Sequence, residues 1–247
     1  LFYFILYLTG VIFIATGLAL FWYMWRYDGS RNPDPVKYTH GNHALEVCWS
    51  ILPAAVLLFI AFYQFNSWAD TKLRRPMNPG PDGVLNTIDD PVLPGPDGIS
   101  GNNDDTPMPL APLAEVTGRQ FEWRLRYPGE DQRMGTADDL FLVNDLHVPL
   151  GENVVLAIKS DDVLHSFFLP NFRLKQDVVP GMKQYVWFEP TRVGTYDIVC
   201  AELCGWGHYK MKGRVTVETR EKFDAWLQRM YEEQELSRFI VSDEEDE

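Results

Sequence analysis

Two long stretches near the start of the chain contain no charged residue, residues 1–25 and residues 47–69. At about 1.5 Å per residue in a helix, each stretch is longer than the ~30 Å hydrocarbon core of a bilayer. Aromatic residues of the kind found at membrane interfaces stand near the ends of both: Trp22, Tyr23, Trp25, Tyr27, Trp49 and Trp68. The pattern predicts a transmembrane helical hairpin within residues 1–70.

Two other interpretations of these stretches fit less well. A signal peptide has a basic start, a short apolar centre and a small-residue cleavage site, and residues 1–25 lack that layout. A buried core helix needs protein around it, and nothing near residues 47–69 is large enough to enclose it. The chain begins at Leu1 rather than Met, so we expect its natural N-terminus to be processed or absent.

A hairpin places the N-terminus and everything after Asp70 on the same side of the membrane. Basic residues do not choose that side, because three lie in the connection between the stretches and three follow the second stretch. From the charge count alone, the orientation stays undecided.

Residues 71–114 are rich in Pro, Gly, Asp and Asn with almost no apolar periodicity, so we expect a linker or insertion there. A twelve-residue frame occurs twice in this segment and again at residues 128–139: PGPDGVLNTIDD, PGPDGISGNNDD and PGEDQRMGTADD. Carboxylates at fixed offsets in turns can surround calcium, although the spacing is not that of an EF-hand, and acidic turns are often simply solvated. Both interpretations concern the same residues: Asp82, Asp89, Asp90, Asp97, Asp104, Asp105, Asp131, Asp138 and Asp139.

Residues 115–219 have the texture of an all-β domain. Short segments rich in β-branched and aromatic residues alternate with turns: FEWRLRY, LFLVNDLHVPL, NVVLAIKS, QYVWFEP, GTYDIVC and GRVTVET. A region of this size predicts a small sandwich or Greek-key barrel. Within residues 220–247, apolar residues at helical spacing predict a short amphipathic helix that packs on the sandwich or a neighbour, followed by an acidic tail.

The net charge of −13 makes nucleic acid an unfavourable partner and a basic protein a suitable one. The last six residues, SDEEDE, are expected only to aid solubility. With three cysteines, one of them Cys48 at the start of a predicted span, a disulfide framework is not expected.

The stretch CAELCGWGHYKM, residues 200–211, concentrates metal-binding side chains directly after a predicted strand. Cys200, Cys204, His208 and Met211 follow one another at intervals of four, four and three residues. Such a loop can turn these side chains toward one point. His165, in DVLHSFFLP just after another predicted strand, could close the site from the side.

Several kinds of site use such residues. Zinc takes two Cys and two His, but it rarely takes a thioether such as that of Met211, whereas copper does. A redox dithiol needs no His and Met at set distances. Cys204, His208 and Met211 with His165 make up the ligand set of a single blue-copper centre, and Cys200 is then one ligand too many. Two thiolates and two imidazoles suit two coppers, with electron relay as the expected role.

Together, the predicted hairpin, the β domain and the motifs DVLHS, VPG and CAELCGWGHYKM resemble subunit II of the cytochrome c oxidases in the haem-copper oxidase family. The resemblance covers both spans and the β domain but not the repeats or the acidic tail. It implies a cupredoxin-like Greek-key sandwich. The string Cys-x-Glu-x-Cys-x-x-x-His-x-x-Met is otherwise shared mainly with nitrous oxide reductase, which has no such membrane hairpin.

The resemblance implies that Cys200 and Cys204 bridge the dinuclear copper centre CuA, with His165 and His208 as nitrogen ligands. It assigns the weak thioether ligand to Met211 and a backbone carbonyl ligand to Glu202. The Glu202 side chain is further implied to reach a magnesium or manganese ion shared with subunit I. The alternative for that side chain is a simple exposed glutamate.

Three other positions take roles from the same resemblance. Glu46 matches a glutamate at the mouth of a proton channel shared with subunit I, although an interfacial charge at a helix end is an equal alternative. In RQFEWRLRY, Phe121 and Trp123 occupy the places of two tryptophans through which electrons are received. Asp162 matches an acid that faces the donor.

The resemblance therefore implies an oxidoreductase subunit that takes electrons from cytochrome c or another basic donor and passes them to haem in subunit I, where oxygen is reduced and protons are pumped. It places the β domain in the periplasm of a bacterial cytoplasmic membrane, or in the intermembrane space if mitochondrial. Further oxidase subunits and membrane lipid are the other expected partners. The chain has no Cys-x-x-Cys-His motif, so we expect no c-type haem of its own. The alternative function is a membrane-tethered copper- or zinc-binding module for metal delivery or structure.

Overall fold

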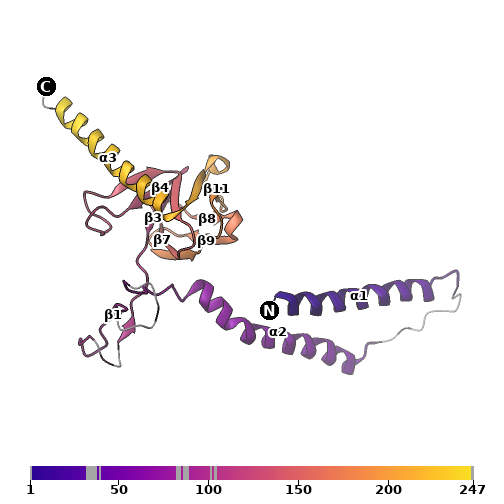
Figure 1. Cartoon of the computed structure of the whole chain (residues 1–247). Coiled ribbons are helices and arrows are strands. Elements are labelled where there is room, and N and C mark those ends of the chain that lie inside the picture. Colours follow the sequence, from indigo (N-terminus) through magenta and orange to yellow (C-terminus); the bar gives the residue numbers. More distant parts are fainter. Residues whose placement is uncertain are drawn as a thin grey trace. The chain divides into compact units, whose positions relative to one another are not determined.

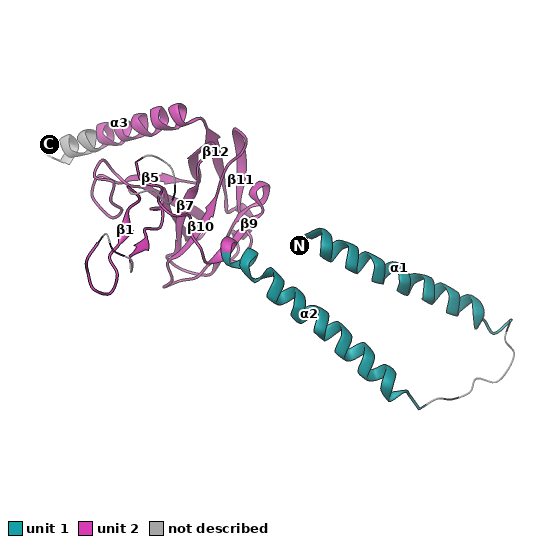
Figure 2. Ribbon diagram, turned by 60° about the horizontal axis from the view of Figure 1, so that its bottom comes forward, with its two compact units in different colours: residues 1–69 teal, residues 70–247 magenta. Residues whose placement is uncertain are grey.

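A computed structural model of the chain describes residues 2–31, 38, 40–81, 85, 89–100, 102 and 105–245, with side chains described as far as residue 237. The chain divides into two compact units, residues 1–69 and 70–247, which Figure 2 colours separately.

The first unit is a hairpin of two long helices, α1 (Phe2–Arg26) and α2 (His43–Lys72), that run side by side in opposite directions (Figure 1). Both are long and apolar enough to cross a membrane, with mean hydropathies of 2.3 and 2.2 in their most apolar windows, and neither window is buried by protein. The side chain of Asn42 caps α2 by accepting hydrogen bonds from the amides of Ala44 at 3.1 Å and Leu45 at 3.3 Å. The last turn of α2, from Asp70, belongs to the second unit.

Two five-stranded sheets form the centre of the second unit. The first has the order β10-β7-β3-β4-β5, from Gln184–Phe188, Val154–Ser160, Ala114–Arg119, Glu122–Tyr127 and Leu140–Val143. The second has the order β6-β12-β11-β8-β9, from Asp145–Pro149, Lys212–Glu218, Gly194–Cys200, His165–Leu169 and Leu174–Val178. The pairs β3–β7 and β6–β12 are parallel, and the other pairs in these sheets are antiparallel. A separate pair, β1 (Val92–Leu93) with β2 (Thr106–Pro107), lies within the Pro- and Gly-rich segment.

The core of the domain lies between the two sheets, where both contribute buried apolar side chains: Val116, Leu125, Leu156, Ile158, Phe167, Ile198 and Val215. Strand β12 shows the alternation that builds it, with exposed and buried residues in turn along its first four positions. Because each sheet has one face in this core, the two form a sandwich. The predicted fold class, a helical hairpin with a cupredoxin-like β-sandwich and a C-terminal helix, is confirmed.

The segment 140–150, expected as one continuous strand, is two strands in different sheets. The chain changes sheets at Asn144, whose φ of 60° is in the left-handed region that Asn tolerates better than most residues. Its side-chain oxygen accepts a hydrogen bond from the amide of Trp123 at 2.8 Å, and its carbonyl accepts one from the amide of Arg214 at 2.7 Å. Asn144 therefore joins the two sheets at this corner. Strands β3, β8 and β9 were not among the expected segments.

The C-terminal helix α3 (Arg220–Glu245) is longer than expected and is fastened by its first turns. Phe223 and Trp226 are buried, and the Trp226 ring stacks on the His147 imidazole with the centroids 3.9 Å apart. Further along, the Gln234 side chain accepts a hydrogen bond from the Phe141 amide at 3.1 Å and donates one to the Asp139 carbonyl at 2.9 Å. Packing on β5 and β6 thus determines where α3 lies.

Replacing Trp226 by alanine should free the helix. We expect Trp226→Ala to lower the free energy of unfolding by about 3 kcal/mol, because a buried indole and its ring contact are lost. Arg229→Ala is a matched control on the same helix, since its pair with Glu233 is exposed and should matter little. Denaturation of the purified chain, followed by near-ultraviolet circular dichroism, measures both, and equal losses would contradict this account.

Candidate metal centre

The pairing of β8 with β11 brings two distant parts of the sequence together. His165 is the first residue of β8 and Cys200 the last of β11, and the strands run antiparallel with Cys200 opposite Phe167. The loop 201–211 leaves this pair and is tied at both ends by backbone hydrogen bonds. The Ala201 amide donates to the Ser166 carbonyl at 3.0 Å, and the Cys200 amide donates to the Met211 carbonyl at 3.2 Å. The sheet therefore holds the loop against His165.

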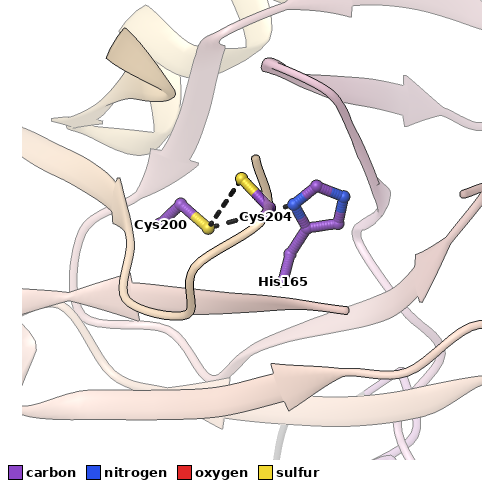
Figure 3. A group of neighbouring side chains, drawn as sticks. All are labelled: His165, Cys200 and Cys204. Carbon is purple, nitrogen blue, oxygen red and sulfur yellow. Dashed lines mark hydrogen bonds between the residues drawn. The ribbon is translucent and has the colours of Figure 1, made fainter. Parts of the chain in front are cut away.

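Three buried ligand groups converge inside this arrangement, as Figure 3 shows. The Cys200 and Cys204 sulfurs are 3.9 Å apart, and the Cys200 sulfur is also 3.9 Å from Nδ1 of His165. The ligand atoms of the three residues all lie within 4.8 Å of one another. Among the described residues, this is the one group of three or more His, Cys, Asp or Glu side chains that lie close enough together to hold a metal ion.

The remaining expected ligands surround the same two sulfurs. Nδ1 of His208 is 3.6 Å from the Cys204 sulfur, and the Met211 sulfur is 3.7 Å from it on a fully buried side chain. The Cys200 sulfur lies 3.2 Å from the Glu202 carbonyl oxygen. Each thiol thus has a different imidazole beside it, and both imidazoles present Nδ1 to the sulfurs. The structure brings together all six residues expected at the site.

Asp162 contacts the His165 ring at Nε2, the nitrogen that does not face the sulfurs. One carboxylate oxygen lies 2.8 Å from Nε2 of His165, and the other accepts a hydrogen bond from the Gln120 amide at 2.8 Å. A carboxylate on the outer nitrogen of an imidazole sets the orientation and tautomer of the ring. Asp162 therefore turns Nδ1 of His165 toward the sulfurs, and the donor-facing role expected for it stays a prediction.

Two glycines make room for the rings of His165 and Phe121. A Cβ on Gly118 of β3 would lie 2.8 Å from Cδ2 of His165, and a Cβ on Gly207 would lie 2.5 Å from Cδ2 of Phe121. Any side chain at either position would push a ring out of place, because real Cβ contacts are longer. Both glycines are therefore required by close packing.

The surroundings move the pKa values of the two thiols in opposite directions. Burial opposes ionisation of Cys200, but hydrogen bonds from His165 and from the Ser166 backbone outweigh it and lower its pKa to about 6. Burial and the neighbouring Cys200 charge raise the pKa of Cys204 to about 11. The pKa of His165 is raised, because contacts with Cys200 and Asp162 outweigh the effect of its burial. In the metal-free chain the two sulfurs are thus not equivalent.

The aromatic residues expected to receive electrons lie at different depths. Trp123 is fully buried, with its ring 6.0 Å from the His165 ring, whereas Phe121 is half-buried. The outermost ring belongs to Trp206, which sequence analysis passed over. It is 81% exposed, and its centroid is 5.2 Å from that of Phe121 in an edge-to-face contact. The available signal was a tryptophan placed between Cys204 and His208 in the ligand loop.

The other expected site residues lie away from this cluster. Glu46 is exposed in the first turn of α2, in the first unit, and its proton-channel role stays a prediction. Of the repeat carboxylates, Asp82 and Asp104 lie outside the described residues. Others accept hydrogen bonds from their own loops: Asp97 from Ile99, Asp105 from Gly95, Asp131 from Arg133 and Asp139 from Gly135. Calcium binding stays a prediction.

Two protein-family models match the chain. The model described as the periplasmic domain of cytochrome c oxidase subunit II matches residues 115–218, and the model described as its transmembrane domain matches residues 1–66. The first of these regions contains the whole candidate metal centre, and the second contains almost all of the helical hairpin.

Related proteins carry the same description. Over 243 residues, the chain is 30% identical to cytochrome c oxidase subunit 2 of Thermostichus vulcanus, covering 88% of this chain and 70% of that one. Over 136 residues it is 42% identical to an alternative cytochrome c oxidase subunit 2 of Bradyrhizobium diazoefficiens, covering 46% of this chain and 49% of that protein. The chain thus spans about half the length of the second relative. A crystal structure of the periplasmic domain of a Bradyrhizobium japonicum subunit II matches with a TM-score of 0.45 at 25% identity, covering 51% of this chain and 97% of that one.

The unequal thiols can be tested in the metal-free chain. In a Cys48→Ser background, which leaves only the pair, we expect one thiolate to form as the pH rises through about 6, because contacts with His165 and Ser166 stabilise the Cys200 anion. Thiolate absorbance in the far ultraviolet measures it. His165→Gln removes one contact and should move this step to higher pH. A first step near the ordinary thiol pKa of about 8.5 in the unsubstituted pair would contradict the prediction.

Proposed function

Since this chain belongs to the cytochrome c oxidase subunit II family, we propose that its β domain holds a dinuclear copper centre, CuA, and relays electrons from a donor protein to haem in subunit I of a haem-copper oxidase. The observation that carries the proposal is the pair of buried thiols 3.9 Å apart, each with Nδ1 of a different imidazole beside it. A single metal needs only one such thiol in a blue-copper site, so the second thiol supports two metals.

The donor set fits copper. Cys200 and Cys204 would hold the two ions through their sulfurs, His165 and His208 would each supply a nitrogen, and the Met211 thioether and the Glu202 carbonyl would complete the set. Thiolate, thioether and imidazole are the ligands that copper favours, and a thioether is one that zinc rarely takes. Bound there, the copper pair supplies one-electron oxidation and reduction.

The protein contributes a rigid and dry site. The β-ladder fixes both ends of the ligand loop, and Asp162 holds the His165 ring in one orientation. Both sulfurs and the Met211 side chain are buried, which keeps water away. The lowered pKa of Cys200 means that one thiolate is already formed at neutral pH, so metal binding has fewer protons to displace. A site arranged before the electron arrives needs little movement when its charge changes.

The donor would dock on the exposed face of the ligand loop. Leu203, Trp206 and Tyr209 are 76%, 81% and 66% exposed, and they make an unusual group of large apolar side chains for so short a loop. Exposed apolar groups of this kind mark interaction sites, and Trp and Tyr are frequent energetic centres of interfaces. The Trp206 ring, resting on Phe121, would be the outermost aromatic contact to the donor. The net charge of −13 would attract a basic donor such as cytochrome c.

The rest of the chain would place this site in a larger assembly. The two apolar helices would anchor the subunit beside subunit I and other oxidase subunits among membrane lipids, with the β domain on the periplasmic or intermembrane-space side. The Glu202 side chain would reach a magnesium or manganese ion shared with subunit I, and Glu46 would admit protons. Oxygen reduction at haem and proton pumping would belong to the partner subunit.

Copper stoichiometry tests the central proposal. We expect the purified full chain to bind two coppers with an intense colour and a delocalised mixed-valence spin-resonance signal, because both sulfurs are shared. Cys200→Ser should abolish that signal, whereas Cys48→Ser, which changes an exposed thiol in α2, should leave it intact. Elemental analysis and spin resonance measure both, and one colourless zinc per chain would refute the copper centre.

Truncating Trp206 tests the donor surface. We expect Trp206→Ala to slow reduction of the oxidase complex by its donor about tenfold, because a central aromatic contact is lost, while the copper spectrum stays unchanged. Leu203→Ala is the matched control, because Leu203 is a similarly exposed apolar residue of the same loop that has no aromatic ring to pack on Phe121. Stopped-flow reduction measures both rates. If Trp206→Ala and Leu203→Ala behave alike, the special role of the indole is disproved.

A further inference from the structure

A small hollow opens in the second unit where α2 ends. It has a volume of about 230 Å³ and is lined by Lys72, Leu73, Arg75, Gln176, Gln184, Tyr185 and Trp187. Strand β9 contributes Gln176 and β10 contributes the last three residues. These are the edge strands of the two different sheets, so the hollow lies along one side of the sandwich.

The charged residues of the lining are both basic, which is unusual in so acidic a chain. The Arg75 guanidinium lies over the Tyr185 ring, 3.9 Å from its centroid, and makes no hydrogen bond or ion pair with any residue that the structure describes. The Lys72 ammonium donates to the Lys175 carbonyl at 3.2 Å and to the Gln176 side-chain oxygen at 3.3 Å, both neutral groups. Neither positive charge is therefore balanced by a carboxylate within this part of the molecule.

The neighbouring arginine shows the contrast. Arg74 pairs with Asp70 at 2.8 Å across one helical turn, and it does not line the hollow. The guanidinium of Arg75 instead lies over an aromatic ring, with its N–H donors left for another acceptor. Since Arg presents a fork of donors that matches phosphate and carboxylate oxygens, an anion of that kind is the fitting partner.

A second unsatisfied group lies in the same lining. The side-chain oxygen of Gln184 is buried and accepts no hydrogen bond among the described residues. Buried polar atoms nearly always have a partner, and the described residues supply none to this acceptor. The protein itself therefore leaves the polar groups around the hollow incompletely satisfied.

The position in the chain identifies the source of that phosphate. Lys72 is the last residue of α2, the helix whose apolar window is long enough to span a bilayer, and the hollow begins at that residue. The headgroups of a membrane lie directly beyond the end of such a span, and Tyr and Trp are the aromatic residues enriched there. We propose that this hollow binds the phosphate headgroup of an anionic phospholipid.

Lipid binding to the full chain tests the proposal. In detergent, we expect dioctanoyl phosphatidylglycerol to bind in native mass spectrometry, and dioctanoylglycerol, which lacks the phosphate, not to bind. Arg75→Gln should weaken binding about tenfold, because a charged hydrogen-bonding partner is lost. Arg74→Gln removes the same charge one residue away and should change binding by less than about twofold, since Arg74 is already paired.

Three results would overturn the proposal. Equal weakening by Arg74→Gln and Arg75→Gln would indicate a general charge effect, and unchanged binding in Arg75→Gln would exclude the hollow. Displacement of the lipid by inorganic phosphate at equal concentration would identify a site for free phosphate and not for lipid. Unchanged near-ultraviolet circular dichroism of both variants provides the folding control, and the proposal does not depend on the copper centre.

Discussion

The antiparallel pairing of β8 with β11 is the contact on which the candidate metal centre depends. In the sequence, 34 residues lie between His165 and Cys200, and an unfolded chain would rarely bring the two together. The β-ladder holds them together, because Cys200 lies opposite Phe167 and the Ala201 amide donates a hydrogen bond to the Ser166 carbonyl. Strand β12 then returns beside β11, so the loop between them starts and ends on one sheet. Loss of this pairing would separate the ligands without changing any of them.

The sandwich explains why such a site can be both buried and accessible. The ligand atoms face inward, next to Trp123 and Phe167 in the core, whereas the outer side of the same loop carries Leu203, Trp206 and Tyr209 into solvent. The eleven-residue loop 201–211 thus joins a buried interior to an exposed apolar surface. This arrangement keeps water from the sulfurs while the outer side of the same loop stays open to solvent.

Most of the remaining chain can be understood as support for that arrangement. Asn144 carries the chain from one sheet to the other, and Gly118 clears the space that the His165 ring fills. Helix α3 packs on the domain through the stacking of Trp226 on His147. The hairpin of α1 and α2 belongs to a separate unit up to residue 69, and Lys72 and Arg75 of the second unit line the hollow at the edge of the sandwich.

The amino-acid sequence was sufficient for those features that depend on local pattern. Long uncharged stretches predict membrane-spanning helices, and alternating segments predict most of the strands. The spacing of Cys200, Cys204, His208 and Met211 within one loop predicts that these side chains share a site. The sequence alone did not place β8, whose residues HSFFL lack a polar and apolar alternation, or the change of sheets at Asn144.

Only the tertiary structure decided the contacts between distant segments. The buried position of Trp123, the exposed ring of Trp206 on Phe121, the carboxylate of Asp162 behind His165 and the hollow beside Arg75 all arise where separate strands and loops meet. Side-chain depth and partners depend on how two sheets stack and on which edges coincide. Local pattern carries no information about either, because it reports the face of an element and not the element that covers it.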